Sequence, residues 1–335
     1  MRICLVGDFS ENLDEGFKNI TFRIAKELSD HHRIMKLNIK KIFSTDFWKD
    51  VRTFPNPQIV HYLTAPTLRS FVVLKILGFY WRDAKTITSA LHPNLSSFSK
   101  KIVSLVKPDL ILTQSYESDR MFRDLGCRTG FLSNGVNIKK FVPVTKNAKE
   151  RLREKYGIDR DKFVVLHVGH LMKRRNLQVF DRIQSENNQV VIIGSKYMRT
   201  DQKIYQHLKK IGGIVYLGYL KNIEEMYALS NCYIFPVIKG GSILTPLSVM
   251  EAMSCNLPVI TRDFDGLTRI FSEGDGLIFA KKDEDFINAI DTIKKGLEVK
   301  TREKIMPYSW KNIGMELDEI YSKILKSKEV SGIER

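Results

Sequence analysis

The chain has 335 residues, of which 43% are hydrophobic and 27% charged, the values of a globular protein long enough for two domains. Its four cysteines are widely spaced without a Cys-x-x-Cys pair, which excludes a zinc ribbon and a disulfide framework and indicates a reducing compartment. No signal peptide is recognisable, and no apolar run approaches the roughly 20 residues of a membrane span, so we expect a cytoplasmic protein.

The first part of the chain alternates between short apolar runs and helical patterns. Apolar runs bounded by turn residues predict strands at residues 3–6, 34–39, 59–63, 86–89, 110–113 and 130–132. Helical spacing predicts helices between them, near residues 16–28, 66–79, 95–106 and 116–125. Such alternation is typical of a doubly wound α/β domain.

The stretch 69–82 differs from the other predicted helices. It is strongly apolar and aromatic, with Arg69 and Arg82 at its ends and Lys75 inside. Two interpretations stay open. The stretch is a core helix of the α/β domain, or it lies in the interface of an anionic membrane to which the protein binds peripherally.

The net charge of +16 raises the question of an anionic partner. The lysines and arginines are spread through the chain, with their densest clusters at residues 40–41, 100–101, 139–140 and 173–175. No nucleic-acid-binding module accompanies them, so we expect no nucleic-acid partner. The sequence gives no indication of the oligomeric state.

The second part of the chain follows a charged segment at 141–160, which contains Pro143 and which we interpret as a linker with a surface helix. Strands are then predicted at residues 163–168, 190–193, 215–217, 232–235, 258–261 and 277–279, and an amphipathic helix at 309–325. The expected organisation is a first domain at 1–140, the linker, a second domain at 161–308 and a terminal helix at 309–327.

Residues 231–261 carry the most specific functional signal. A buried strand is followed by Gly240 and Gly241, then by a helix near 246–254 and another strand, which together form a βαβ unit. The helix N-terminus favours an anion, and Glu251 stands about one and a half turns into that helix, where its carboxylate can accept hydrogen bonds from ligand hydroxyls. This combination suits a ligand that is both phosphate and polyol. The alternative is an ordinary crossover with a solvated Glu251.

This segment resembles the donor-binding segment of the large retaining glycosyltransferase family 4. The residues that match the family pattern are Leu247, Met250, Glu251, Ala252, Met253, Pro258, Val259 and Ile260. The Glu-x7-Glu motif of the family is degenerate here, because Ile243 occupies the first Glu position, while Leu244 and Pro246 replace loop glycines. The resemblance implies a GT-B fold, in which two doubly wound Rossmann-like domains face each other across a cleft and the C-terminal helix crosses back to the first domain.

Further motifs carry the same resemblance. Residues 166–176 are similar to the V-G-R-L-x-x-x-K-N motif, whose Arg and Lys bind the donor diphosphate, and they place His170 and Arg175 at those positions. Gly16 corresponds to the glycine loop of the family, and His92 follows a predicted strand at the position where a family histidine faces the cleft. The resemblance implies His92 and Arg175 as catalytic residues. The implied donor-binding residues are Gly16, His170, Arg175, Gly241, Ser242, Thr245, Leu247, Ser248 and Glu251.

The activity that the resemblance implies is retaining, metal-independent transfer of a sugar from a nucleotide diphosphate sugar to a hydroxyl of a glycan or lipid-linked acceptor. No other cofactor is expected. The pair Asp263 and Asp265 matches an Asp-x-Asp metal motif, but the same spacing recurs twice elsewhere, and we expect no metal site. Two alternatives stay open: an epimerase of nucleotide sugars that transfers to no acceptor, and a non-catalytic protein that binds nucleotide sugars or a membrane surface.

Overall fold

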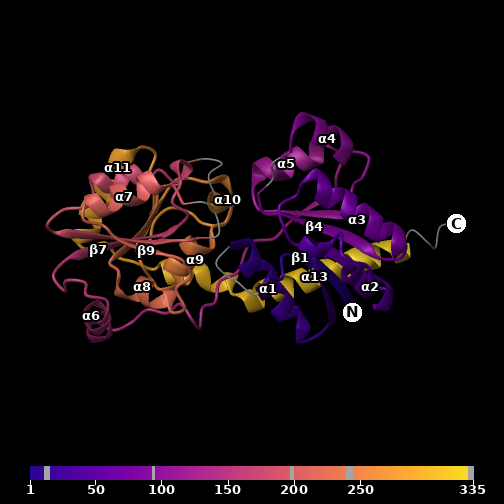
Figure 1. The fold of residues 1–335 in the computed structure, drawn as a ribbon, viewed down its shortest axis with the longest axis horizontal. Coiled ribbons are helices and arrows are strands. Elements are labelled where there is room, and N and C mark those ends of the chain that lie inside the picture. Colours follow the sequence, from indigo (N-terminus) through magenta and orange to yellow (C-terminus); the bar gives the residue numbers. More distant parts are fainter. Residues whose placement is uncertain (11–15, 93–94, 197–199, 239–243, 331–335) are drawn as a thin grey trace. The chain divides into compact units, whose positions relative to one another are not determined.

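The computed structural model describes residues 1–10, 16–92, 95–196, 200–238 and 244–330 (Figure 1). The chain divides into two compact units. Unit 1 comprises Met1–Gly135 and Trp310–Arg335, and unit 2 comprises Val136–Ser309.

Unit 1 is built on a parallel six-stranded sheet with the order β2-β1-β3-β4-β5-β6. Its elements are β1 (Arg2–Gly7), α1 (Gly16–Ser29), β2 (Arg33–Asn38), η1 (Ile39–Lys41), α2 (Thr45–Thr53), β3 (Ile59–Tyr62), α3 (Leu68–Tyr80), β4 (Lys85–Ala90), α4 (Ser97–Val103), β5 (Leu110–Thr113), α5 (Tyr116–Asp124), β6 (Thr129–Phe131) and α13 (Trp310–Val330).

Alternation along the strands of unit 1 decides which helix covers which face. Val60 and Tyr62 of β3 belong to the same buried cluster as side chains of α2 and α3. His61, between them, points to the opposite face and contacts α13. Figure 1 shows α1 and α13 on one side of this sheet and α3, α4 and α5 on the other. The C-terminal helix therefore packs on the first unit, as the resemblance implied.

A buried polar chain fixes α13 to this sheet. His61 Nδ1 lies 2.6 Å from the Tyr321 hydroxyl of α13, and His61 Nε2 lies 2.9 Å from Ser89 Oγ of β4. His61 and Tyr321 are fully buried. Burial lowers the pKa of His61 to about 3, so the imidazole is neutral and its two nitrogens serve as one donor and one acceptor.

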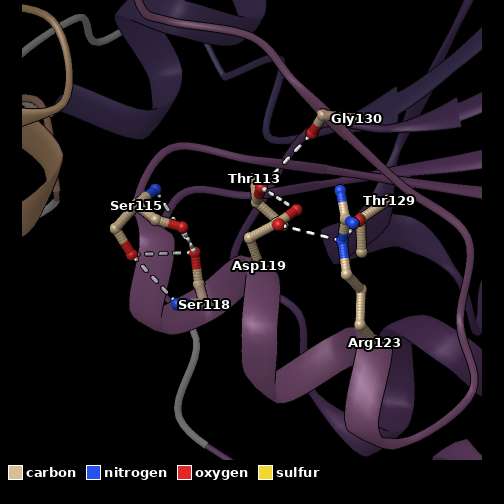
Figure 2. A network of polar contacts seen from close by, with 7 residues as sticks. All are labelled: Thr113, Ser115, Ser118, Asp119, Arg123, Thr129 and Gly130. Carbon is tan, nitrogen blue, oxygen red and sulfur yellow. Dashed lines mark hydrogen bonds and ion pairs between the residues drawn. The ribbon is translucent and has the colours of Figure 1, made fainter.

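The N-terminus of α5 is closed by its own side chains (Figure 2). Ser115 and Ser118 form a capping box, in which each hydroxyl accepts a hydrogen bond from the backbone N–H of the other residue. Asp119 accepts a hydrogen bond from Thr113 (3.3 Å) and pairs with Arg123 (2.9 Å), which in turn donates to Thr129. These contacts link β5, α5 and β6 at the edge of the sheet.

Unit 2 also contains a parallel six-stranded sheet, with the order β12-β11-β10-β7-β8-β9. Its elements are α6 (Lys146–Lys155), β7 (Phe163–Gly169), η2 (Lys173–Arg175), η3 (Leu177–Asp181), β8 (Asn188–Gly194), α7 (Gln202–Lys210), β9 (Ile214–Leu217), α8 (Ile223–Leu229), β10 (Cys232–Phe235), α9 (Leu247–Ser254), β11 (Val259–Thr261), α10 (Asp265–Thr268), β12 (Leu277–Phe279), α11 (Asp283–Lys294), α12 (Thr301–Ile305) and η4 (Met306–Tyr308).

The division between the units differs from the expected boundaries at 140 and 160. It falls between Gly135 and Val136, and the segment 141–160 is part of unit 2. The reason is Arg153 of α6, which is 5% exposed and donates to the carbonyl oxygens of Leu229 (3.0 Å) and Arg160 (2.7 Å). A charged sequence thus packs as part of a domain, because its arginine satisfies buried backbone carbonyls.

Replacing Tyr321 by Phe tests the anchoring of α13. The substitution removes the hydroxyl and leaves a buried nitrogen of His61 without its partner, so we expect a loss of about 1–3 kcal/mol in the free energy of unfolding. Urea denaturation measures it. The matched control is Tyr219→Phe, since Tyr219 is 61% exposed and the same change there should stay within about 0.5 kcal/mol. Equal effects for both variants would contradict the anchoring role.

Candidate active site in unit 2

The strand order of unit 2 creates a topological switch point between β7 and β10. From β7 the chain moves outward through β8 to β9, and then returns to the other side of β7 to form β10, β11 and β12. In open parallel sheets, ligands bind outside the carboxyl ends of the strands at such a point. The segments that follow β7 and β10 meet here, since the Ile238 backbone N–H donates to the carbonyl oxygen of Arg174 (3.4 Å).

Arg175 places a buried positive charge at this point. Its side chain ends the short helix η2, is 9% exposed, and lies with its guanidinium carbon 5.7 Å from the centre of the Phe235 ring. Within the described residues, its buried Nε has no hydrogen-bond partner. Burial lowers the pKa of Arg175 to about 10, so the group stays charged at neutral pH.

The turn that presents Arg175 is held by Asn176. This residue adopts the left-handed region (φ 50°), which asparagine tolerates better than most residues, and its side-chain amide donates to Asp283 at 2.9 Å. Arg262 pairs with the same carboxylate. The orientation of Arg175 is therefore set by a short loop that is fastened to the start of α11.

Two histidines beside Arg175 are neutral at neutral pH. His167 Nδ1 lies 2.9 Å from the Ile234 carbonyl oxygen, so Nδ1 carries the proton and the buried Nε2 is a free acceptor among the described residues. Burial and the charge of Arg175 lower the pKa of His170 to about 4. Burial and the same charge lower the pKa of His167 to about 3, although the bond to Ile234 opposes the shift. Arg175 thus supplies the full positive charge of this cluster.

The helix α9 begins at the same end of the sheet. It starts after Pro246, and no described side chain caps its first turn. Thr245, just before it, is fully buried. Gly241 and Ser242, two of the expected donor-binding residues, lie outside the described residues, as does Ile243.

A buried tyrosine holds Glu251 of α9, and a second buried tyrosine packs beside the first. The Tyr227 hydroxyl donates to Glu251 Oε2 at 2.7 Å. The neighbouring Tyr233 hydroxyl donates to the Val168 carbonyl oxygen at 3.3 Å, and its ring lies 5.8 Å from that of Tyr227. The bond from Tyr227 therefore fixes the carboxylate of Glu251, while the residue remains partly exposed.

The charges of Glu251 and Arg175 both act on the hydroxyl of Tyr233. Burial raises its pKa far above the usual value; a hydrogen bond with Ser248 and the charge of Arg175 oppose that shift, whereas the charge of Glu251 adds to it. The structure thus brings Arg175, Ser248 and Glu251 into one electrostatic neighbourhood. The sequence analysis did not select Tyr227 and Tyr233, because a tyrosine inside an apolar run reads as core and only the bonds of its hydroxyl reveal a positioning role.

The remaining expected site residues are divided between the two units. Leu247 opens α9, whereas Gly16 is the first residue of α1 in unit 1. His92 follows β4 in unit 1 and is partly buried. Among the described residues, no three acidic, histidine or cysteine side chains gather in a way that would hold a metal ion. Within the same residues, no helix has the length and apolar character needed to span a membrane.

Comparison with known proteins gives the site a family context. Residues 148–311 match the model of the family "Glycosyl transferases group 1". The match covers most of unit 2 and supports the glycosyltransferase family that the sequence motifs resemble.

Curated relatives carry glycosyltransferase names. A UDP-Gal:alpha-D-GlcNAc-diphosphoundecaprenol alpha-1,3-galactosyltransferase of Escherichia coli is 32% identical over 174 residues, which are 48% of this chain and 43% of that protein. An alpha-galactosylglucosyldiacylglycerol synthase of Streptococcus pneumoniae is 28% identical over 163 residues, 46% of this chain and 42% of that protein. The chain thus matches less than half the length of these two relatives.

Solved structures share the whole architecture. Anabaena Alr3699/HepE in complex with UDP and glucose has a TM-score of 0.75 at 16% identity, covering 96% of this chain and 100% of that one. Sucrose-phosphate synthase from Thermosynechococcus elongatus has a TM-score of 0.77 at 16% identity, covering 98% of this chain and 100% of that one. These likenesses confirm the expected GT-B fold with its two α/β units.

The neutral histidines make stability depend on pH. An unfolded histidine titrates near pH 6.5, whereas the pKa of folded His61 and His167 is about 3 and that of His170 about 4. Their contribution to stability is complete above pH 6.5 and is lost as the pH falls toward the folded values, by up to about 1.4 kcal/mol per pH unit for each group.

Urea denaturation at pH 7.5, 6.5 and 5.5, values chosen around the unfolded pKa of about 6.5, measures this dependence. We expect a small fall in the free energy of unfolding between the two higher values and a larger fall between the two lower ones. His170→Gln should reduce the larger fall. A stability that is independent of pH over this range would show that the histidines are not held neutral.

Proposed function

We propose that this protein is a glycosyltransferase that moves a sugar from a nucleoside diphosphate sugar to a hydroxyl acceptor. The observation that carries the proposal is that unit 2 holds a buried cation and a fixed carboxylate near its switch point. The cation is Arg175, whose Nε has no partner among the described residues, and the carboxylate is Glu251, which accepts a bond from Tyr227. A cation such as Arg175 binds a diphosphate, and a carboxylate such as Glu251 accepts hydrogen bonds from ribose hydroxyls. The family match over residues 148–311 and the names of the relatives support the same assignment.

In this proposal the donor lies across the carboxyl ends of β7 and β10. The diphosphate contacts Arg175 and the amide groups at the start of α9, where the helix dipole favours negative charge. The ribose hydroxyls donate to Glu251. His170, which is neutral, offers a hydrogen bond rather than a charge to the diphosphate. The neighbouring fold of HepE was solved with UDP and glucose, so UDP is the first nucleotide to test.

The proposed chemistry breaks the bond between the anomeric carbon and the diphosphate oxygen. Negative charge grows on that oxygen in the transition state, and Arg175 stabilises it more strongly than it stabilises the ground state. The acceptor hydroxyl then forms the new bond on the same face of the sugar, with retention, and its proton passes to the departing diphosphate oxygen. We assign His92 of unit 1 to a hydrogen bond with the donor sugar or the acceptor. No metal takes part in this scheme.

The sugar-binding part of the site is the least similar to the family pattern. Ile243 replaces the first Glu of the motif, and Pro246 supplies no N–H. We therefore assign contacts with the donor sugar to Gly241, Ser242 and Thr245. This departure makes an unusual donor sugar part of the proposal.

The proposed acceptor is a lipid-linked or cell-surface glycan. The E. coli relative is named for a diphosphoundecaprenol-linked sugar and the S. pneumoniae relative for a diacylglycerol lipid. A cytoplasmic enzyme that binds peripherally to the membrane would reach acceptors of both kinds.

Replacing Glu251 by Gln tests the donor site. Glutamine keeps one oxygen for the Tyr227 hydroxyl, so the fold should survive, but the charge-assisted bonds to the donor are lost. We expect the affinity for the nucleotide to fall by roughly 1.5–3 kcal/mol, about ten- to a hundredfold.

Isothermal titration with UDP, GDP and ADP measures the affinity. The matched control is Glu303→Gln on the exposed side of α12, which should bind like the wild type. Unchanged binding by Glu251→Gln would remove this residue from the site. Tight binding without turnover against any nucleotide sugar and acceptor pool would favour a non-catalytic protein.

A further inference from the structure

The helix α3 of unit 1 is apolar on both of its faces. Phe71, Leu74 and Leu77 are buried against the sheet. On the outer face, Ile76 is 47% and Phe79 is 72% exposed, and Val72 and Tyr80 are exposed beside them. A surface helix normally turns a polar face to solvent, so this outer face is an unpartnered apolar surface.

Phe43 extends this surface beyond the helix. It lies between η1 and α2, is 91% exposed, and sits 5.5 Å beneath the guanidinium of Arg69 at the start of α3. At the other end of the helix, the Arg82 guanidinium lies 5.3 Å from the Phe79 ring. We call the outer face of α3 together with Phe43 the α3 surface.

The stretches that form the α3 surface are cationic, and the exposed carboxylates of Asp46 and Asp83 lie just beyond their ends in the chain. The stretches 39–44 and 68–82, which form it, contain five lysines or arginines and no acidic residue. Lys40 is engaged by Asp8 at 2.8 Å, whereas Arg69, Lys75 and Arg82 are exposed. Apolar side chains are thus interleaved with long cationic ones, whose stems lie along apolar surface while their heads reach outward.

We propose that the α3 surface docks on an anionic lipid membrane. Phenylalanine and tyrosine side chains enter the boundary between head groups and acyl chains, and the flanking cations meet anionic head groups. A second copy of the chain is the poorer occupant. A symmetric dimer would place the same cations against each other, between two molecules that each carry a net charge of +16.

The stretch 69–82 was interpreted either as a core helix or as a membrane-interface helix, and each interpretation describes one of its faces. Its inner face is core and its outer face is exposed, so the docking contact depends on Phe79 and Tyr80. Trp81 is 2% exposed and Phe71 is fully buried, so substituting either would test stability and not docking. The α3 surface lies in unit 1 and does not depend on the donor site of unit 2, so the two proposals fail independently.

Co-sedimentation with vesicles tests the proposal. One set of vesicles is pure phosphatidylcholine, and the other contains about one-third phosphatidylglycerol, which gives a negative surface potential. We expect the wild-type chain to bind the anionic vesicles at low ionic strength and to be released from them by salt, with little binding to the neutral ones.

Phe43→Ser and Phe79→Ser are each expected to lower the partition coefficient about tenfold, because each removes a large exposed aromatic side chain from the contact. Lys75→Glu should lower it by a similar factor. Two controls separate location from composition. Leu105→Ser removes another apolar side chain that is 78% exposed, and Lys203→Glu makes the same charge change on α7 of unit 2. Both controls should bind as the wild type does.

Three results would overturn the proposal. The first is a wild-type chain that stays unbound with anionic vesicles at low salt. The second is an equal loss of binding in Lys203→Glu and Lys75→Glu, which would indicate a diffuse effect of net charge. The third is self-association of the wild type that Phe79→Ser abolishes while vesicle binding persists, because the α3 surface would then be covered by a second copy.

Discussion

Unit 2 keeps the charge of Arg175 buried at the point where the strand order reverses. This burial is unfavourable in free energy, and the rest of the site is arranged around it. A cation that is 9% exposed, with its Nε unpaired among the described residues, destabilises the folded chain unless an anion joins it. Burial, with a smaller effect of that charge, lowers the pKa of the two neighbouring histidines and keeps them neutral. A stable fold that retains such a cluster has a site prepared for an anion before the anion arrives, which is the condition for electrostatic stabilisation in catalysis.

Two buried tyrosines lie beside the carboxylate of this site, and one of them positions it. Tyr227 holds the Glu251 carboxylate, and Tyr233 lies in the fields of both Glu251 and Arg175. In the proposed site, Glu251 binds hydroxyl groups of the donor and Arg175 binds its phosphates. One ligand that combines a diphosphate with a ribose satisfies both ends. In unit 1 a fully satisfied bond network performs the structural role instead, since His61 bridges Ser89 and Tyr321 without an unpaired atom.

The alternation of apolar runs was enough to predict both sheets and the order of most elements, because parallel strands are buried on both faces. Glu251 and Arg175 were predicted as site residues from motifs, and the structure places both in unit 2. Three features could not be read from the sequence. The segment 141–160 looked like a linker because burial of Arg153 depends on carbonyl groups far along the chain. The tyrosine braces depend on hydroxyl geometry. The stretch 69–82 required knowledge of which side of α3 meets the sheet, since both sides are apolar.

The most direct test of the account is the dissociation constant of UDP for Arg175→Met, measured by calorimetry on protein whose melting temperature is recorded alongside. Methionine fills similar volume without charge, so the account predicts a melting temperature equal to or above that of the wild type. It also predicts an affinity at least about tenfold weaker, since charged hydrogen bonds contribute roughly 1.5–3 kcal/mol. An unchanged dissociation constant, or a large fall in melting temperature, would show that Arg175 serves the fold and not the donor.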